Sequence, residues 1–143
     1  MGDFKLSKRS KKNIKDVRKT IIEMVTRVLV KSDHDFGIPN DGGKRTAQEQ
    51  NNLYHLRVNG NRVTWLDGFN KLSFHQSGDA VDIFIYDEHG ACWACIEKYK
   101  HVADLMKLEF ELMKEEGLFK SEEKLVWGGD WRRKDLPHFE VRQ

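Results

Sequence analysis

Apolar residues recur at steps of three and four positions in two stretches of the chain, as they do along the buried face of a helix. The first stripe follows Ser10, a residue type that caps helices. It comprises Ile14, Val17, Ile21, Met24, Val25, Val28 and Leu29. The second lies in residues 91–116, before a stop signal at Gly117. It comprises Ile96, Tyr99, Val102, Ala103, Met106, Phe110 and Met113. The pattern predicts an N-terminal helix and a long central helix.

Three other segments have the β-branched and aromatic composition of strands. They are residues 80–86 (AVDIFIY), 125–127 and 138–141. Gly60 and Asn61 give a turn signal between two short apolar runs and indicate a hairpin. This order of elements predicts an α+β fold, with a small antiparallel sheet packed with the N-terminal and central helices.

The intervening segments are polar. Residues 33–43 and 67–78 are rich in residues that favour loops, and residues 46–56 fit a short polar helix. A length of 143 residues and a mass of 16.8 kDa allow one domain, so we expect a single domain over residues 1–143. An aromatic content of 10% argues against disorder.

The chain is not expected to insert stably in a membrane. Its longest apolar run, residues 91–96, is far below the roughly 18 residues of a membrane span. No apolar stretch follows the charged N-terminus, so we expect no signal peptide and a chain that is made in a cytoplasm and, if exported, leaves by another route.

Charge is distributed unevenly. The chain has a net charge of +2, but residues 1–20 alone carry +6 and the remaining residues −4. A basic N-terminus beside a mildly acidic body suits an anionic partner such as nucleic acid, lipid or wall polymer. A solvated helix face explains the same charges.

A histidine and a carboxylate lie close together in the segment SFHQSGDAVD (residues 73–82). On one helix His75 and Asp82 would be about 10 Å apart, too far to bind the same zinc ion. A loop that turns at Gly78 and enters a strand brings them together, because glycine has the backbone freedom that the turn needs.

A second cluster lies near the end of the chain. His138 and Glu140 face the same side of the predicted strand, so His138 is a third candidate ligand and Glu140 a candidate partner for an imidazole. Asp135 precedes this strand, across Pro137, from where its carboxylate could reach a water. Three ligands, an open position and a nearby carboxylate are typical of a hydrolytic zinc site. Surface histidines beside acids would fit the same residues.

These motifs resemble one family of zinc enzymes. The segment SFHQSGDAVD matches all five fixed positions of the SxHxxGxAxD signature of VanY-like D-Ala-D-Ala carboxypeptidases and phage L-alanyl-D-glutamate peptidases. The family's second signature resembles Asp135, His138 and Glu140, and WGGDW (residues 127–131) is similar to the phage-type members. The segment GKRT (residues 43–46), followed by two glutamines, resembles a third element. The resemblance covers nearly the whole chain.

The resemblance implies a role for each matching residue. His75, Asp82 and His138 would bind one zinc ion. Asp135 would be the general base that takes a proton from the attacking water and passes it to the leaving amine. Arg45 would hydrogen-bond a carbonyl oxygen or a carboxylate of the substrate.

Further residues would support the site. Ser73, Glu140 and Asp130 would orient ligands or fix loops. Trp127 and Trp131 would either line the cleft or pack in the core. Some phage-type members carry an acidic, calcium-binding insert before the last zinc histidine. Only residues 132–137 lie there in this chain, so we expect no calcium regulation.

The implied function is that of a zinc-dependent peptidoglycan endopeptidase cleaving the L-Ala-D-Glu bond, a phage endolysin for host cell lysis. An aspartate at the base position favours this over the carboxypeptidases. The enzyme would be a monomer without a nucleic-acid partner, held in the host cytoplasm until it is released to the cell wall. Two alternatives stay open: a D-Ala-D-Ala carboxypeptidase with the same zinc chemistry, and a basic nucleic-acid-binding protein.

The pair Cys92 and Cys95 has its own alternatives. A CxxC at a helix start could be a redox pair or half of a zinc knuckle. The sequence has no second cysteine pair and no preceding βαβ pattern. We therefore predict two packed free thiols, which could form a disulfide after export to an oxidising space.

Overall fold

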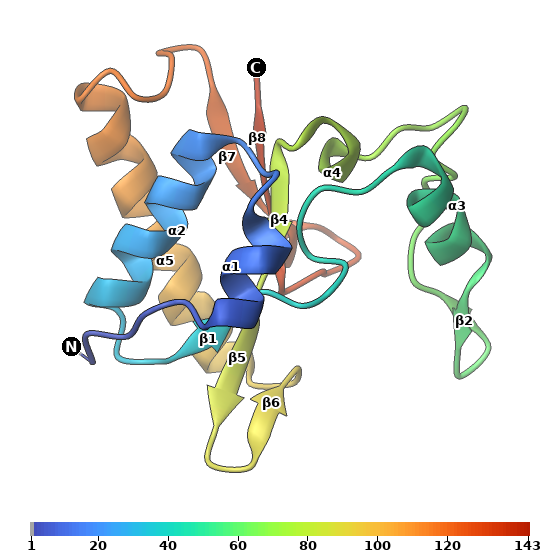
Figure 1. The fold of residues 1–143 in the computed structure, drawn as a ribbon, viewed down its shortest axis with the longest axis horizontal. Helices are drawn as coiled ribbons and strands as arrows, with labels where there is room; N and C mark the ends of the chain where they lie inside the picture. The colour runs from blue at the N-terminus through green and yellow to red at the C-terminus, as the bar shows by residue number, and fades with distance from the viewer. Residues whose placement is uncertain (1) are drawn as a thin grey trace.

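The computed structural model describes residues 2–143 and has a mixed architecture of helices and short antiparallel strands (Figure 1). Three helices lie together on one side: α1 (Lys8–Ile14), α2 (Lys19–Lys31) and α5 (Ile96–Glu115). Next to them is an antiparallel sheet with the order β4 (Ala80–Asp82), β8 (His138–Arg142), β7 (Lys124–Trp127). A second antiparallel sheet has the order β1 (Phe36–Gly37), β5 (Phe84–Asp87), β6 (Gly90–Cys92). The predicted α+β class is confirmed.

Both helical stripes are buried as predicted, except for Ile96 at the start of α5, which is 51% exposed. The stripe of α2 packs against that of α5, and the two share one core with the inward side chains of the sheets. Gly117, in the left-handed region at φ 81°, follows the end of α5. Of residues 2–143, no helix is long and apolar enough to cross a bilayer.

The N-terminal stripe spans two helices rather than one. Ser7, not Ser10, caps α1, because its hydroxyl accepts a hydrogen bond from the Ser10 backbone N–H at 3.1 Å. Ser10 is buried, and its own hydroxyl accepts from the Ile38 N–H. The chain turns before α2, where the Arg18 N–H donates to the Gly78 carbonyl at 2.9 Å. A distant partner thus replaces the hydrogen bond of a continuous helix.

The predicted strand at residues 80–86 is divided between the two sheets. The break falls at Ile83, whose backbone N–H donates to the Pro137 carbonyl at 3.0 Å. The residues before the break form β4, which pairs with β8, and those after it form β5, which pairs with β1 and β6.

The central helix begins at Ile96, five residues later than predicted. Residues 90–92 form β6 instead, and Cys92 and Cys95 are joined by a disulfide. The prediction of free thiols is therefore wrong for this structure. The bridge closes a tight loop that leads from the strand into the helix, and that loop carries Trp93.

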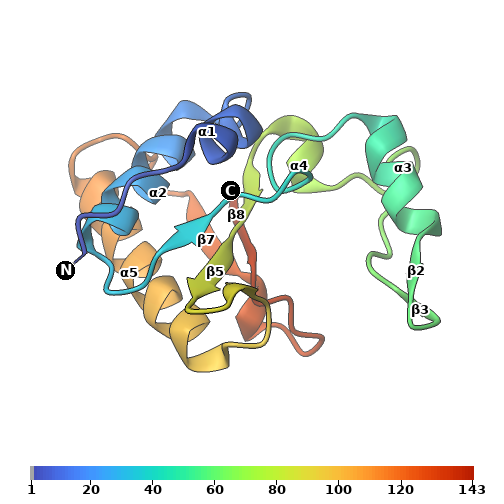
Figure 2. The same cartoon turned by 60° about the horizontal axis from the view of Figure 1, so that its bottom comes forward.

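An arm, residues 46–72, extends away from the helices (Figure 2). Its polar helix is α3 (Ala47–His55), capped by Thr46 through a capping box. The hairpin of β2 (Arg57–Val58) and β3 (Asn61–Arg62) is also present. Its turn residues are Asn59 and Gly60, both with positive φ, one position earlier than predicted. A short helix, α4 (Phe74–Ser77), follows the arm where a loop was predicted.

Candidate metal and catalytic site

Local turn chemistry places His75 and Asp82. Ser73 caps α4, and its hydroxyl accepts from the His75 backbone N–H at 3.2 Å. Gly78 ends the helix at φ 81° and turns the chain towards β4. In the sheet, Asp82 lies directly opposite His138 on β8. The turn at Gly78 was predicted correctly, but His75 lies on a helix rather than on a loop.

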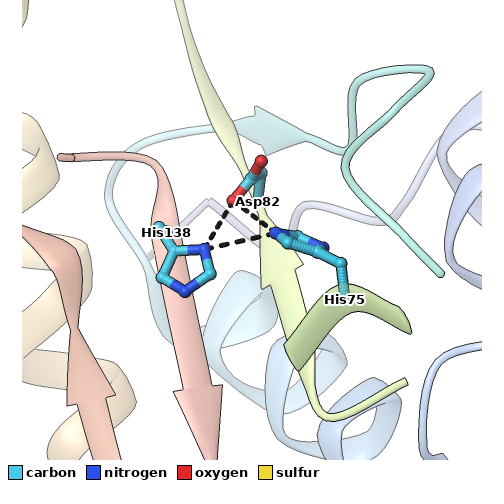
Figure 3. A group of neighbouring side chains, drawn as sticks. All are labelled: His75, Asp82 and His138. Carbon is cyan, nitrogen blue, oxygen red and sulfur yellow. Dashed lines mark hydrogen bonds and ion pairs between the residues drawn. The ribbon is translucent and has the colours of Figure 1, made fainter. Parts of the chain in front are cut away.

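Three ligand-type atoms converge between these elements (Figure 3). His75 Nε2 and His138 Nδ1 are 3.2 Å apart. Asp82 Oδ1 lies 3.1 Å from His138 Nδ1 and 3.2 Å from His75 Nε2. Atoms that bind one zinc ion at about 2 Å lie within roughly 3.5 Å of one another, so this triangle has the right size.

The outer nitrogen of each imidazole is held by an acceptor. His75 Nδ1 lies 2.9 Å from the Gly43 carbonyl, and His138 Nε2 lies 2.6 Å from a Glu140 oxygen. Because a carbonyl only accepts, the proton of neutral His75 is on Nδ1, and Glu140 favours the Nε2–H tautomer of His138. When both imidazoles are neutral, their inward nitrogens present lone pairs to the Asp82 carboxylate, so a proton on His138 Nδ1 or a metal ion must offset the negative charge between them. Such a donor set fits a cation.

The charges around the triangle favour positive charge at its centre. Burial opposes ionisation of Asp82, yet the histidines beside it hold the pKa of this carboxyl well below its usual range. Burial also opposes charge on His138, but the carboxylates of Asp82 and Glu140 raise its pKa to about 9. The carboxylates and imidazoles together therefore favour a cation between the three side chains.

Asp135 lies on the wall of a cleft of about 550 Å³ above the triangle. Partial loss of water around its carboxyl raises the pKa of Asp135, and the negative charge of Asp82 raises it further. A group of this kind can take up and release a proton more readily than an ordinary aspartate.

The glycines of WGGDW give Asp135 its place. The Asp135 N–H donates to the Gly128 carbonyl at 2.9 Å. A Cβ on Gly128 would lie 2.3 Å from the Asp135 carbonyl oxygen, and one on Gly129 would lie 2.2 Å from the Trp127 ring. Neither position has room for a side chain. The two glycines therefore allow the loop that carries Asp135 to pack closely against residues 127–129.

Arg45 is nearly buried and lines the cleft, but its donors are largely used within the protein. Nη2 donates to Asp82 Oδ2 at 3.0 Å, Nε to the Asp41 carbonyl at 2.8 Å and Nη1 to Gln50 at 3.0 Å. The guanidinium therefore holds the outer oxygen of Asp82 and connects the triangle to the arm. The resemblance did not imply this contact.

The remaining candidates lie in different places. Ser73, Glu140 and Trp131 line the cleft. Trp127 is buried, packs on Phe139 and donates from its ring N–H to the Leu136 carbonyl, so it belongs to the core. Asp130 makes a 2.8 Å ion pair with Lys107 and is absent from the cleft wall.

Several residues of the site carried no sequence signal. The arm contributes Leu53, Val63, Thr64 and Leu66 to the cleft, and the disulfide loop contributes Trp93. Their positions depend on how distant segments pack, which the spacing of residues along the sequence does not reveal.

In the described part of the chain, a second group of residues of metal-binding types comprises Asp87, Cys92 and Cys95. Since these cysteines form the disulfide, they offer no thiolate, and the zinc-knuckle alternative does not apply.

Comparisons with known proteins agree with this architecture. The family model described as phage L-alanyl-D-glutamate peptidase matches residues 1–143. Among solved structures, the crystal structure of the L-Ala D-Glu endopeptidase ChiX from Serratia marcescens superposes with a TM-score of 0.71. The match is 22% identical and covers 98% of this chain and 91% of the other, a likeness that establishes the fold. No curated protein matches the chain.

Proposed function

The chain belongs to the phage L-alanyl-D-glutamate peptidase family and is a peptidoglycan endopeptidase of that type; from this premise we propose that its hydrolysis depends on zinc bound by His75, Asp82 and His138. The observation that carries the proposal is the convergence of two imidazole lone pairs and a carboxylate from α4, β4 and β8. Two histidines, one carboxylate and an open cleft are a donor set that suits catalytic zinc.

Zinc in this position would lower the pKa of a water at its open coordination site to about 7 and polarise the scissile carbonyl. Asp135, on the cleft wall, accepts the proton of the attacking water and passes it to the amine of the leaving D-Glu. Its raised pKa suits both transfers, since a general base works best when its pKa approaches the operating pH.

The other residues hold this arrangement in place. Glu140 and the Gly43 carbonyl fix the orientation of the two imidazoles. Arg45 fixes Asp82 and, from the cleft wall, is also the residue we assign to the substrate carbonyl. Trp131 forms part of the wall that limits water around the scissile bond.

We assign the enzyme to host cell lysis as an endolysin that acts as a monomer. It would be made in the host cytoplasm and reach peptidoglycan after release. The basic N-terminal segment would then serve contact with anionic envelope polymers. Family membership gives no support to the nucleic-acid-binding alternative.

The test is digestion of purified peptidoglycan by zinc-loaded protein, with and without a chelator, followed by mass spectrometry of the new termini. We expect free L-Ala carboxyl and D-Glu amino termini, and loss of cleavage in chelator. Release of terminal D-Ala alone would instead indicate the carboxypeptidase. Undiminished cleavage by fully demetallated protein would rule out the zinc assignment.

Asp135→Ala tests the base. The variant should keep stoichiometric zinc and lose activity by about 10²- to 10⁴-fold, the range of general base catalysis. Asp104→Ala, at an exposed position of α5, is the matched control and should cleave normally. An Asp135→Ala enzyme with unchanged kcat would show that another group is the base.

A further inference from the structure

A second hollow continues the catalytic cleft. This groove, of about 940 Å³, runs between the arm and the loop that follows WGGDW. Val63, Thr64, Leu66, Trp131 and Asp135 line both the groove and the cleft. The two spaces therefore open into each other beside the proposed catalytic base, and a substrate longer than the scissile bond can occupy both.

The groove has a basic lining. Arg62, Arg133 and Lys134 contribute to it, and Asp135, at its junction with the cleft, is its one carboxylate. Arg133 and Lys134 are exposed. Within residues 2–143, none of these three cations takes part in an ion pair. Their charge is available to a ligand.

Aromatic contacts hold two of the cations in the wall. The Arg133 guanidinium lies 3.7 Å from the centroid of the Trp65 ring, and that of Arg62 lies 4.2 Å from the Tyr54 ring. Arg62 also donates to the Tyr54 carbonyl at 2.8 Å, and Lys134 donates to the Gly129 carbonyl at 3.0 Å. Such contacts reduce the conformational entropy that a cation loses when it binds an anion.

The position of Asp135 tells which part of the substrate enters the groove. In the proposed function Asp135 delivers a proton to the leaving amine, so the leaving group must lie against it. Asp135 lines both the cleft and the groove, whereas the three metal-ligand residues line the cleft alone. The groove therefore faces the leaving side of the scissile bond, which begins with D-Glu.

The chemistry of D-Glu matches the groove. This residue has two carboxyl groups, and an onward amide bond uses at most one of them. At least one carboxylate thus lies a few bonds from the leaving amine. Arginine binds carboxylates through paired N–H donors, and lysine adds a compact charge. Arg45 is less suited to this role because it already binds Asp82.

We propose that the groove between the arm and residues 131–135 is the leaving-group subsite, in which Arg133 and Lys134 bind the free carboxylate of D-Glu. This inference rests on the proposed function and adds the determinant of its specificity. It predicts that the enzyme distinguishes D-Glu from its carboxamide form by charge.

The test compares two synthetic peptides with zinc-loaded protein. In both, acetyl-L-alanyl-D-glutamate is extended through one carboxyl, and the other carboxyl is either free or converted to a primary carboxamide. Wild-type enzyme should have a higher kcat/KM for the free acid, and this preference should weaken with added salt. The double variant Arg133→Gln/Lys134→Gln should lose roughly tenfold to a hundredfold on the acid and little on the carboxamide.

Arg132→Gln is the matched control, since Arg132 is exposed on the same loop and lines neither space. It should leave both substrates unaffected, and the carboxamide peptide reports on folding and zinc chemistry in every variant. Equal losses on both peptides in the double variant, or a wild-type enzyme without preference, would overturn the subsite. A wild-type enzyme that cleaves neither peptide nor peptidoglycan would instead overturn the proposed function.

Discussion

Different interactions stabilise the body of this enzyme and its arm. The body, with its two three-stranded sheets and helices α1, α2 and α5, surrounds one apolar core in which side chains such as Met24 and Met106 are fully buried. In the arm most large apolar side chains, among them Trp65 and Phe69, are exposed. Its fully buried side chain is a polar one, Gln50.

The arm is organised by the hydrogen bonds of Gln50 rather than by an apolar core. Its amide nitrogen donates to the Leu66 carbonyl at 2.9 Å, and its oxygen accepts from Arg45 at 3.0 Å. The arm is thus attached to the proposed catalytic site by directional hydrogen bonds, and its apolar residues remain available to line the cleft and the groove. We therefore expect stability to depend mainly on the body, and the arm to provide surface for the substrate.

The largest expected difference between body and arm is in the loss of stability when a phenylalanine of each is replaced by alanine. Phe110 is buried against Phe119, with ring centroids 4.5 Å apart, whereas Phe69 in the arm is 59% exposed. Phe110→Ala should lower the free energy of unfolding by about 3–5 kcal/mol, and Phe69→Ala by less than about 0.5 kcal/mol. Urea unfolding measures both. Equal losses would mean that the arm has an apolar core of its own.

The second largest expected effect concerns an ion pair between two parts of the body that are far apart in the sequence. Arg18 binds both oxygens of buried Glu123, and this pairing is the main reason why the pKa of Glu123 falls to about 2. The folded-state pKa lies below that of the unfolded chain. The stabilisation is therefore complete above about pH 4.5 and is lost as the pH falls towards 2.

Glu123→Gln should cost about 2 kcal/mol at neutral pH and flatten the acid limb of the stability curve. Asp67 is the counterpart in the arm, where its carboxylate accepts backbone N–H bonds within one turn. These bonds also lower the pKa of Asp67, but the carboxylate lies at the surface, so Asp67→Asn, which keeps an acceptor oxygen, should change acid unfolding less than Glu123→Gln does. An unchanged acid limb in Glu123→Gln would show that other carboxylates dominate it.

Gln50→Ala should loosen the arm and leave the body intact. We expect a loss of about 1–2 kcal/mol in local stability, seen as faster amide exchange in residues 61–66, and a roughly tenfold lower kcat/KM. Gln48→Ala, which removes an exposed bond to Asn52, is the control. Unchanged exchange in Gln50→Ala would mean that the arm does not depend on this side chain.

Trp65→Leu should have the smallest effect on stability, within about 0.5 kcal/mol, because the ring is exposed. Losing the stack under Arg133 should still reduce the preference for the free acid over the carboxamide peptide a few-fold. An unaltered preference would show that Arg133 binds without this support.

The sequence predicts the elements of both regions better than the way they pack, because periodicity and turn residues report local conformation and burial. The apolar stripes of α2 and α5 could be predicted for this reason. The turn at Gly78 could be inferred from the spacing of His75 and Asp82. The division of strand 80–86 was not readable, since it depends on the bond between Ile83 and the distant Pro137 carbonyl. Gln50 looks like any residue of a polar helix, and its burial follows from the way that the arm folds back on itself.

The candidate ligands lie on three elements, separated by as many as 63 positions along the chain. An unfolded chain does not hold them together, so metal binding and folding are thermodynamically linked. Free metal at a thousand times its dissociation constant would add about 4 kcal/mol to the unfolding free energy. The apparent melting temperature of the protein would then vary with the concentration of free zinc, and a chelator would act on it as a denaturant does.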